Sequence, residues 1–151
     1  MNDEQITKEI NSFVSGNMEK WINDTILKET IRSAQAANLP DEFISHIKIE
    51  QNENGFLLVN DWIKDDKPLA IYFNYGTVDH YIKPKNKKAL HGGDKWPYFS
   101  KGHYVSGLPK TEAMENGLQI GKKKLENKIK SETKKFSRTL ETKYKVKVKV
   151  R

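Results

Sequence analysis

An apolar stripe runs through the first 38 residues and predicts one long helix. Apolar side chains recur there at three- and four-residue spacing, which is the period of one helix face. The stripe comprises Ile6, Ile10, Phe13, Val14, Met18, Trp21, Ile22, Thr25, Leu27 and Ile31. Asp3 is placed to cap the start, Pro40 disfavours helix at Leu39, and Gly16 is a point where the helix could bend or divide. Because a long helix is unstable alone, the stripe must cover another element.

The segment after Pro40 predicts strands and one short helix. "HIKIE" alternates apolar and polar residues, "QNENG" supplies turn residues and "FLLVND" is extended again, which indicates a β-hairpin. "LAIYFNYG" predicts a short helix ending at Gly76, and a strand remains the alternative. "HYIKPK" returns to an extended pattern, and Pro84 confines it to a sheet edge or a strand end.

The stretch "HGGDKWPYFSKGHYVSGLP" is rich in residues that interrupt regular structure, with four of the nine glycines and two of the five prolines. It predicts a long loop with a short extended piece at His103–Val105. Loops of this length in a compact domain usually carry function or bind a partner. Its aromatic residues Trp96, Tyr98 and Phe99 are the kind that anchor protein interfaces.

A second helix is predicted from Lys110, with Thr111 as its cap. Its stripe is Met114, Leu118, Gly121, Leu125 and Ile129, continued by Phe136 and Leu140. The chain closes with "YKVKVKVR", whose period of two predicts a strand from Tyr144. The sequence therefore predicts an α+β fold, in which the two helices pack on one face of a mainly antiparallel sheet around a long central loop.

Charge is distributed unevenly along the chain. The net charge is +7, and residues 121–151 hold 13 Lys and Arg against 3 Asp and Glu, whereas the remainder holds 14 against 17. We expect a single domain over 1–151, with 121–151 as a basic helix–strand extension. Such an extension suits phosphates or an acidic protein surface, and a solvated helix face is the plainer alternative. The chain has no cysteine and no apolar run of membrane-spanning length, which predicts a protein of the reducing cytoplasm without a membrane partner.

No catalytic motif is evident in the sequence. His80, His91 and His103, with Asp79 and Asp94 nearby, lack the close spacing that places two metal ligands on one element. Asp65–Asp66 reads as solvated charge, and there is no nucleophile elbow or phosphate-binding glycine loop. The sequence thus predicts no enzyme activity, no metal and no cofactor.

The central segment resembles a family of small minor structural proteins of tailed phages and prophages, known as putative tail-component, head–tail joining or tail completion proteins. The resemblance rests on "YFNYGT…HYIKPKNKKALHGG" followed by "WPYFSKGHYVSGLP" and a helix. The matching residues are Tyr75, Gly76 and Thr77 in the turn, His80, Ile82 and Pro84 in the next block, and Lys88, Ala89 and Leu90 in the third. The sequence departs from the family pattern at Asn74, at "LPDEFISH" and at Ser106–Gly107.

The resemblance implies a non-enzymatic subunit that forms homo-oligomeric rings at the neck or tail of a virion, after assembly in the host cytoplasm. It implies that the basic loop meets neighbouring subunits and that DNA passes nearby. The expected interface residues are Tyr75, Gly76, Thr77, Lys85, Lys87, Lys88, Trp96, Tyr98 and Phe99. The alternative is a small nucleic-acid-binding protein that uses its lysine-rich C-terminal third.

Overall fold

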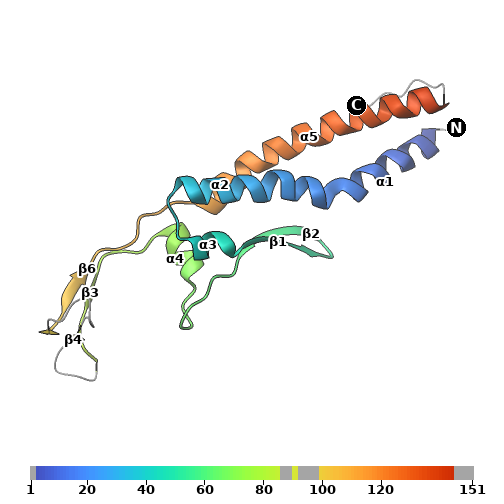
Figure 1. Cartoon of the computed structure of the whole chain (residues 1–151). Helices are drawn as coiled ribbons and strands as arrows, with labels where there is room; N and C mark the ends of the chain where they lie inside the picture. Colours follow the sequence, from blue (N-terminus) through green and yellow to red (C-terminus); the bar gives the residue numbers. More distant parts are fainter. Residues whose placement is uncertain (1–2, 86–89, 92–98, 145–151) are drawn as a thin grey trace. The chain divides into compact units, whose positions relative to one another are not determined.

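The structure, a computed structural model, describes residues 3–85, 90–91 and 99–144 and confirms the α+β class (Figure 1). The chain divides into two compact units. The helical unit comprises Met1–Asp61 and Ala113–Arg151, and the inserted unit comprises Trp62–Glu112. The elements of the helical unit are α1 (Asp3–Ile22), η1 (Asn23–Leu27), α2 (Lys28–Ala36), α3 (Asp41–Ser45), β1 (Ile47–Asn52), β2 (Gly55–Asn60) and α5 (Ala113–Tyr144). Those of the inserted unit are α4 (Leu69–Tyr75), β3 (His80–Ile82), β4 (Leu90–His91), β5 (Phe99–Ser100) and β6 (His103–Val105).

The predicted N-terminal helix is confirmed, with a turn of π-helix inside it. Helical structure continues from Asp3 to Ala36 through η1, and the interruption lies at η1 rather than at Gly16. The buried residues continue at four-residue intervals as Ile22, Ile26, Thr30 and Ala34. Leu27 and Ile31, predicted for the buried stripe, are only half-buried. The π turn has more residues per turn than an α-helix, so it changes which of the following side chains face the core. A prediction that assumes the same spacing along the whole helix does not include this change.

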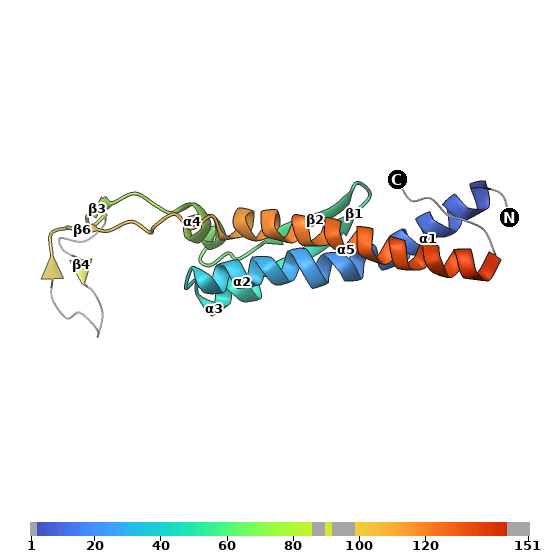
Figure 2. The same ribbon diagram turned by 90° about the horizontal axis from the view of Figure 1, so that it is seen from above.

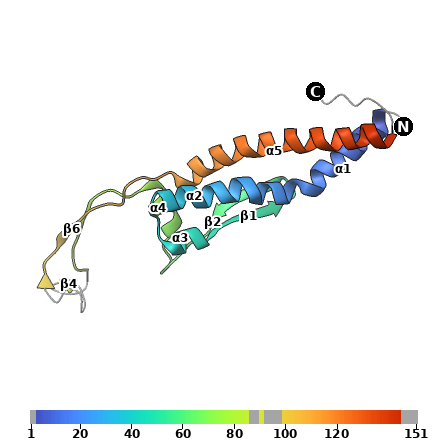
Figure 3. The same ribbon diagram turned by 45° about the horizontal axis from the view of Figure 1, so that its top comes forward.

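Helix α5 packs along α1, η1 and α2, and most extensively against α2. Figure 1, Figure 2 and Figure 3 all show these helices side by side. Gly117 faces the main chain of Thr30, where there is no room for a Cβ atom. A Cβ on Gly121 would lie 2.5 Å from the Cα of Ile26. Two residues four apart on α5, Gly117 and Gly121, therefore pack against two residues four apart on the N-terminal helix, Thr30 and Ile26, and the two backbones lie close together. The buried α5 residues in this row are Ala113, Gly117 and Gly121, next to the predicted Met114 and Leu118.

Aromatic side chains fill the opposite end of the helix pair. Phe13 stacks on Phe136 with ring centroids 4.2 Å apart, and Phe13 also meets Trp21 edge to face at 5.8 Å. Leu140 is fully buried, as its place in the predicted stripe requires. Large rings thus hold the helices apart at this end, whereas glycines let them approach at the other end.

The predicted hairpin of β1 and β2 is confirmed, with Ile47 opposite Asn60 and Asn52 opposite Gly55. Figure 3 shows α5 along one side of α1 and α2 and this hairpin along another. Phe43 of α3 is completely buried, and its carbonyl accepts a hydrogen bond from Asn60 Nδ2 at 2.8 Å. The helical unit therefore has its core where the helices and the hairpin meet.

The described strands form three separate two-stranded antiparallel sheets, β1–β2, β3–β6 and β4–β5. The expected larger sheet under both helices is not what these residues build, because the long helices bury their apolar faces mainly against each other. The stretch predicted as a long loop is also partly paired. In addition to the expected strand at His103–Val105, β5 pairs with β4, so the loop contributes to two ladders.

Two further predictions concern α4 and α5. The short helix ending at Gly76 is confirmed as α4. The second long helix begins at Ala113 rather than at Lys110, and the hydroxyl of Thr111, two residues before it, donates to the Phe73 carbonyl at 3.0 Å. Residue 121, where the basic extension was expected to begin, lies inside α5. The predicted terminal strand falls on 145–151, outside the described residues, while Tyr144 ends α5.

None of the helices in the described residues combines the length and the apolar character needed to cross a bilayer.

Candidate functional site

Hydrogen bonds close the base of an arm in the inserted unit. We call residues 80–105, from the start of β3 to the end of β6, the arm. The strands β3 and β6 are paired and lie side by side in Figure 2. Thr77 N donates to the Leu108 carbonyl at 3.0 Å, and Leu108 N donates to Thr77 Oγ1 at 2.9 Å. Gly107 N donates to Asp79 Oδ1 at 2.6 Å. These four residues form a clamp that holds the two ends of the arm together.

Gly76 makes the turn from α4 into the clamp. Its φ of 76° lies in the left-handed region, which glycine adopts at least cost. A Cβ atom at this position would lie 2.6 Å from the carbonyl oxygen of Leu108 and 2.9 Å from the amide nitrogen of Lys110. Both the backbone angle and the lack of space therefore require glycine here.

The C-terminal end of α4 is fixed to the chain that follows the arm. The carbonyl of Asn74 accepts from the amides of Thr111 at 3.1 Å and Glu112 at 2.9 Å. Asn74 is itself buried, and Trp62 stacks on Phe73 with ring centroids 5.3 Å apart. The inserted unit is thus held largely by main-chain hydrogen bonds around α4, because it buries few large side chains.

The arm presents a pair of tyrosines. Tyr81 of β3 lies directly opposite Tyr104 of β6, and their rings meet edge to face with centroids 5.0 Å apart. The ring of Tyr81 also lies against Gly102, where it leaves no room for a Cβ atom. Despite this contact Tyr81 is 50% exposed and Tyr104 is 79% exposed. The pair supports the ladder on one side and offers aromatic surface to solvent on the other.

Exposed hydrophobic side chains gather in the inserted unit. Seven of the nine large ones in the described residues belong to it, although it is the smaller unit. They are Ile63, Ile71, Tyr75, Val78, Tyr81, Tyr104 and Leu108, whereas the helical unit contributes Leu57 and Ile120. Exposed apolar surface concentrated in one part of a molecule is typical of an interaction site.

The predicted interface residues occupy three different settings. Tyr75 is half-exposed at the end of α4, and Lys85 is exposed beyond β3. Gly76 and Thr77 belong to the base of the arm, where they hold the backbone. Phe99 lies in β5, opposite His91. Lys87, Lys88, Trp96 and Tyr98 fall outside the described residues.

Sequence reasoning missed the residues that shape the arm. Asp79 was weighed only as a metal ligand, and its carboxylate instead accepts the Gly107 amide. Tyr81 and Tyr104 were not among the interface candidates. Their sequence signal is the aromatic residue at the centre of each three-residue extended piece, "HYI" and "HYV". Pairing these two pieces in antiparallel register would have placed the tyrosines opposite each other.

The histidines of the β3–β6 ladder, His80 and His103, lie apart from each other. His80 pairs with Val105 and His103 with Ile82, so they occupy different rungs of the ladder. Across residues 3–85, 90–91 and 99–144, no three His, Cys, Asp or Glu side chains are grouped so that they could hold a metal ion.

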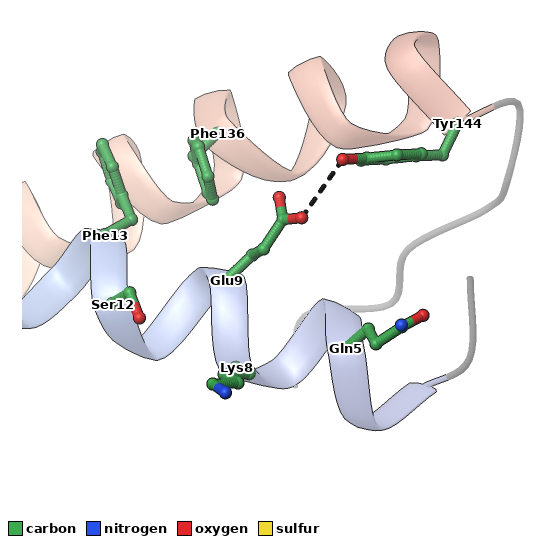
Figure 4. Close-up of a pocket in the computed structure, with 7 residues that line it drawn as sticks. All are labelled: Gln5, Lys8, Glu9, Ser12, Phe13, Phe136 and Tyr144. Atoms are coloured by element: carbon green, nitrogen blue, oxygen red, sulfur yellow. Dashed lines mark hydrogen bonds between the residues drawn. The ribbon is translucent and has the colours of Figure 1, made fainter.

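A groove in the helical unit lies between the start of α1 and the end of α5 (Figure 4). It has a volume of about 860 Å³, and Phe13 and Phe136 supply its apolar wall. Tyr144 donates its hydroxyl hydrogen to Glu9 Oε1 at 3.2 Å, as the dashed line in Figure 4 marks. The groove is open to solvent, and Gln5, Lys8 and Ser12 complete its lining.

One charged cluster lies at the end of the β1–β2 hairpin. Asp61 accepts from Lys48 at 2.6 Å and contacts His46 Nδ1 at 2.9 Å, and Lys48 also pairs with Glu50 at 2.9 Å. The hydrogen bond from Lys48, followed by that from His46, lowers the pKa of Asp61 to about 2. The hydrogen bond to Asp61 raises the pKa of Lys48. The side chains are exposed to solvent, so these ion pairs contribute little to the stability of the hairpin.

No protein-family model matches the chain, and neither the curated proteins nor the solved structures yielded a match.

Proposed function

We propose that this protein is a non-enzymatic structural subunit that assembles with copies of itself into a ring in the neck or tail of a tailed-phage particle. Its role would be head–tail joining or tail completion. The proposal takes the particle and the ring from the sequence resemblance. The observation that carries it in the structure is the arm, which exposes Tyr81 and Tyr104 beside a strongly exposed Val78.

The arm has the chemistry of a protein-binding surface. Tyrosines are among the residues that contribute most to binding energy, because they bury a large area and lose few rotamers. Val78 is 81% exposed and lies two residues before β3, next to the clamp. An apolar residue exposed to this degree gains about 2 kcal/mol when a partner buries it fully.

The clamp supplies the rigidity that such a surface needs. The hydrogen bonds of Thr77 and Asp79 close the base of the arm before any partner arrives. A preorganised surface loses less conformational entropy on association, and more of its contact energy appears as affinity. The clamp therefore supports a role in assembly.

A photo-cross-linking amino acid at position 104 tests the proposal in assembled particles. If the arm binds a second copy, illumination gives a band at twice the subunit mass of 17.5 kDa. The matched control carries the cross-linker at Leu57, an exposed hydrophobic position of the helical unit. A double-mass band from position 104 and not from position 57 is expected. A band that contains a different protein, or equal bands from both positions, would contradict self-assembly through the arm.

Fractionation of particles induced from a host that carries the gene tests the location. The protein is expected in the neck or tail fraction in a fixed ratio to the portal and tail-tube proteins. Its absence from both fractions in otherwise complete particles would overturn the proposed function.

A further inference from the structure

The basic residues of α5 fall into two groups in the described structure. Three lysines form ion pairs: Lys124 with Glu29 at 2.7 Å, Lys128 with Asp24 at 3.4 Å and Lys135 with Glu132 at 2.8 Å. The others lie in no ion pair with any described carboxylate, apart from Lys143 beside the ring of Tyr144. They are Lys122, Lys123, Lys130, Lys134 and Arg138, and all five are exposed.

Four of these cations share one side of the helix. Lys130, Lys134 and Arg138 follow one another at four-residue intervals, and Lys123 precedes Lys130 by two helical turns. The rise of an α-helix puts the last three about 6 Å apart and the whole set over about 22 Å. We call these four residues the cation row. It is a straight line of positive charge on a rigid element.

The surface around the cation row is polar throughout. Asn127, Ser131 and Thr142 lie on the same side and are exposed, and the carboxylates of Glu126 and Glu141 lie on this side as well. The one large exposed hydrophobic residue among those of α5 is Ile120, before the row begins. Helix α5 thus has no aromatic or aliphatic anchor beside these charges, in contrast to the arm.

We propose that the cation row binds the phosphate backbone of a nucleic-acid duplex without reading its sequence. A duplex carries one negative charge per about 1.7 Å of its axis, so the row meets many phosphates along its length. Protein–protein interfaces are depleted in lysine and need apolar anchors, whereas interfaces with nucleic acid are polar and positively charged. Among the described residues, α5 exposes no large aromatic ring beside the row, which argues against single strands, because these bind by base stacking.

Unpaired cations on a helix face are favourable places for such a contact. Each bound phosphate releases condensed counterions, and this release supplies the driving force for non-specific binding. A lysine already paired with a carboxylate would first have to break that pair. The row therefore contributes more than Lys124 or Lys128, which are held by Glu29 and Asp24. Because the row lies in the helical unit, the inference does not depend on the arm or on self-assembly.

Fluorescence anisotropy of the full-length chain with a labelled 25-base-pair duplex of random sequence tests the inference. Four phosphate contacts predict that affinity falls about 100-fold between 50 and 200 mM KCl. The variant Lys130→Gln/Lys134→Gln/Arg138→Gln removes three contacts. The slope of log affinity against log salt concentration should be shallower by about 2.7 for this variant. Its affinity for the duplex at 100 mM KCl should be at least about 10-fold weaker than that of the unchanged protein.

The matched control is Lys8→Gln/Lys20→Gln/Lys28→Gln on α1 and α2. It removes the same three charges from exposed lysines that have no ion pair among the described residues. This control should bind within about 2-fold of the unchanged protein, and circular dichroism should show both variants folded. Equal losses in the two triple variants would reduce the effect to net charge and overturn the inference. So would the absence of duplex binding at 50 mM KCl.

A second ligand separates nucleic acid from an acidic protein. Poly-L-glutamate offers the same sign of charge without phosphates. It should compete for the labelled duplex much less well than unlabelled duplex at equal charge concentration. If it competes equally, and its binding is lost in the α5 variant alone, the row binds acidic protein and the nucleic-acid assignment is wrong.

Discussion

The helical unit and the inserted unit differ in where they place their hydrophobic residues. Nine of the ten buried hydrophobic residues in the described structure belong to the helical unit, and only Ala70 belongs to the inserted unit. Large exposed hydrophobic residues have the opposite distribution, with seven in the inserted unit and two in the helical unit. One unit is therefore stabilised by burial, and the other keeps its apolar surface available.

This difference shows two ways of fixing a backbone. In the helical unit, side-chain packing determines how closely α5 approaches α2 and η1, with Gly117 at the contact with α2 and Gly121 at the contact with η1. In the inserted unit, hydrogen bonds at Thr77 and Asp79 fix the chain and leave tyrosines exposed. Substitution of buried side chains should therefore affect stability in the first unit, and substitution of exposed ones should affect association in the second.

The largest expected effect is that of Phe43→Ala in the helical unit. Phe43 is fully buried, and truncation of such a ring costs about 3–5 kcal/mol through lost burial and the cavity left behind. Tyr104→Ala in the arm is the matched change, and it should alter the free energy of unfolding by less than about 0.5 kcal/mol. Urea unfolding of both variants checks the pair. A loss above about 2 kcal/mol for Tyr104→Ala would place that ring in a core.

Two glycine substitutions should have opposite signs. Gly117→Ala places a Cβ atom against the main chain of Thr30, and overpacking of this kind costs about 1–3 kcal/mol. Gly16→Ala adds its Cβ atom to open space in α1, where alanine should stabilise the helix by about 0.5–1 kcal/mol. Thermal melts of the two variants measure the shifts. Stabilisation by both would mean that α5 does not approach α2 this closely in solution.

Several of the elements were predictable from the sequence because they have a strong local pattern. The long helices, the β1–β2 hairpin, α4 and the extended piece at His103–Val105 were all expected. The choice of contact partner was not predictable in the same way, because it depends on the size of side chains that meet from distant positions. Gly117 and Gly121 each lower the stability of an isolated helix by about 1 kcal/mol relative to alanine. Two such unfavourable residues four apart in a helical pattern indicate that another backbone lies close to this face of the helix.

The candidate site was predictable only in part. The aromatic and basic composition of the centre of the chain indicated an interaction surface, but the residues were assigned by motif and not by pairing register. Gly76 and Thr77 were predicted as interface residues by motif, and the structure brings both against Leu108, about 30 residues later in the chain. Such a contact joins two irregular segments and leaves no periodic pattern in the sequence.

A smaller effect is expected at the clamp. Asp79→Ala removes the acceptor of the Gly107 amide, and the loss of an exposed hydrogen bond costs about 1 kcal/mol. Local opening of the arm base should then be about five times more frequent, with faster hydrogen exchange at the amides of Gly107 and Leu108. Lys83→Ala, an exposed change in the same unit, is the control and should leave these rates unchanged. Unchanged exchange in Asp79→Ala would show that the carboxylate does not hold the arm.

The smallest expected effect is a pH dependence at the hairpin end of the helical unit. The partners Lys48 and His46 lower the pKa of Asp61 to about 2 in the folded chain, against about 3.9 for an unfolded Asp. The stabilisation is therefore fully present above about pH 4 and is lost as the pH falls towards 2. Asp61→Asn should flatten the decline of the melting temperature between pH 4 and pH 2, and the difference from the unchanged protein should shrink in 1 M NaCl because the cluster is exposed. Glu53→Gln in the β1–β2 turn removes an equal charge and should leave the profile as it is. Coincident profiles for the unchanged protein and Asp61→Asn would show that the cluster adds no stability, and the helical unit would then rest on its buried side chains alone.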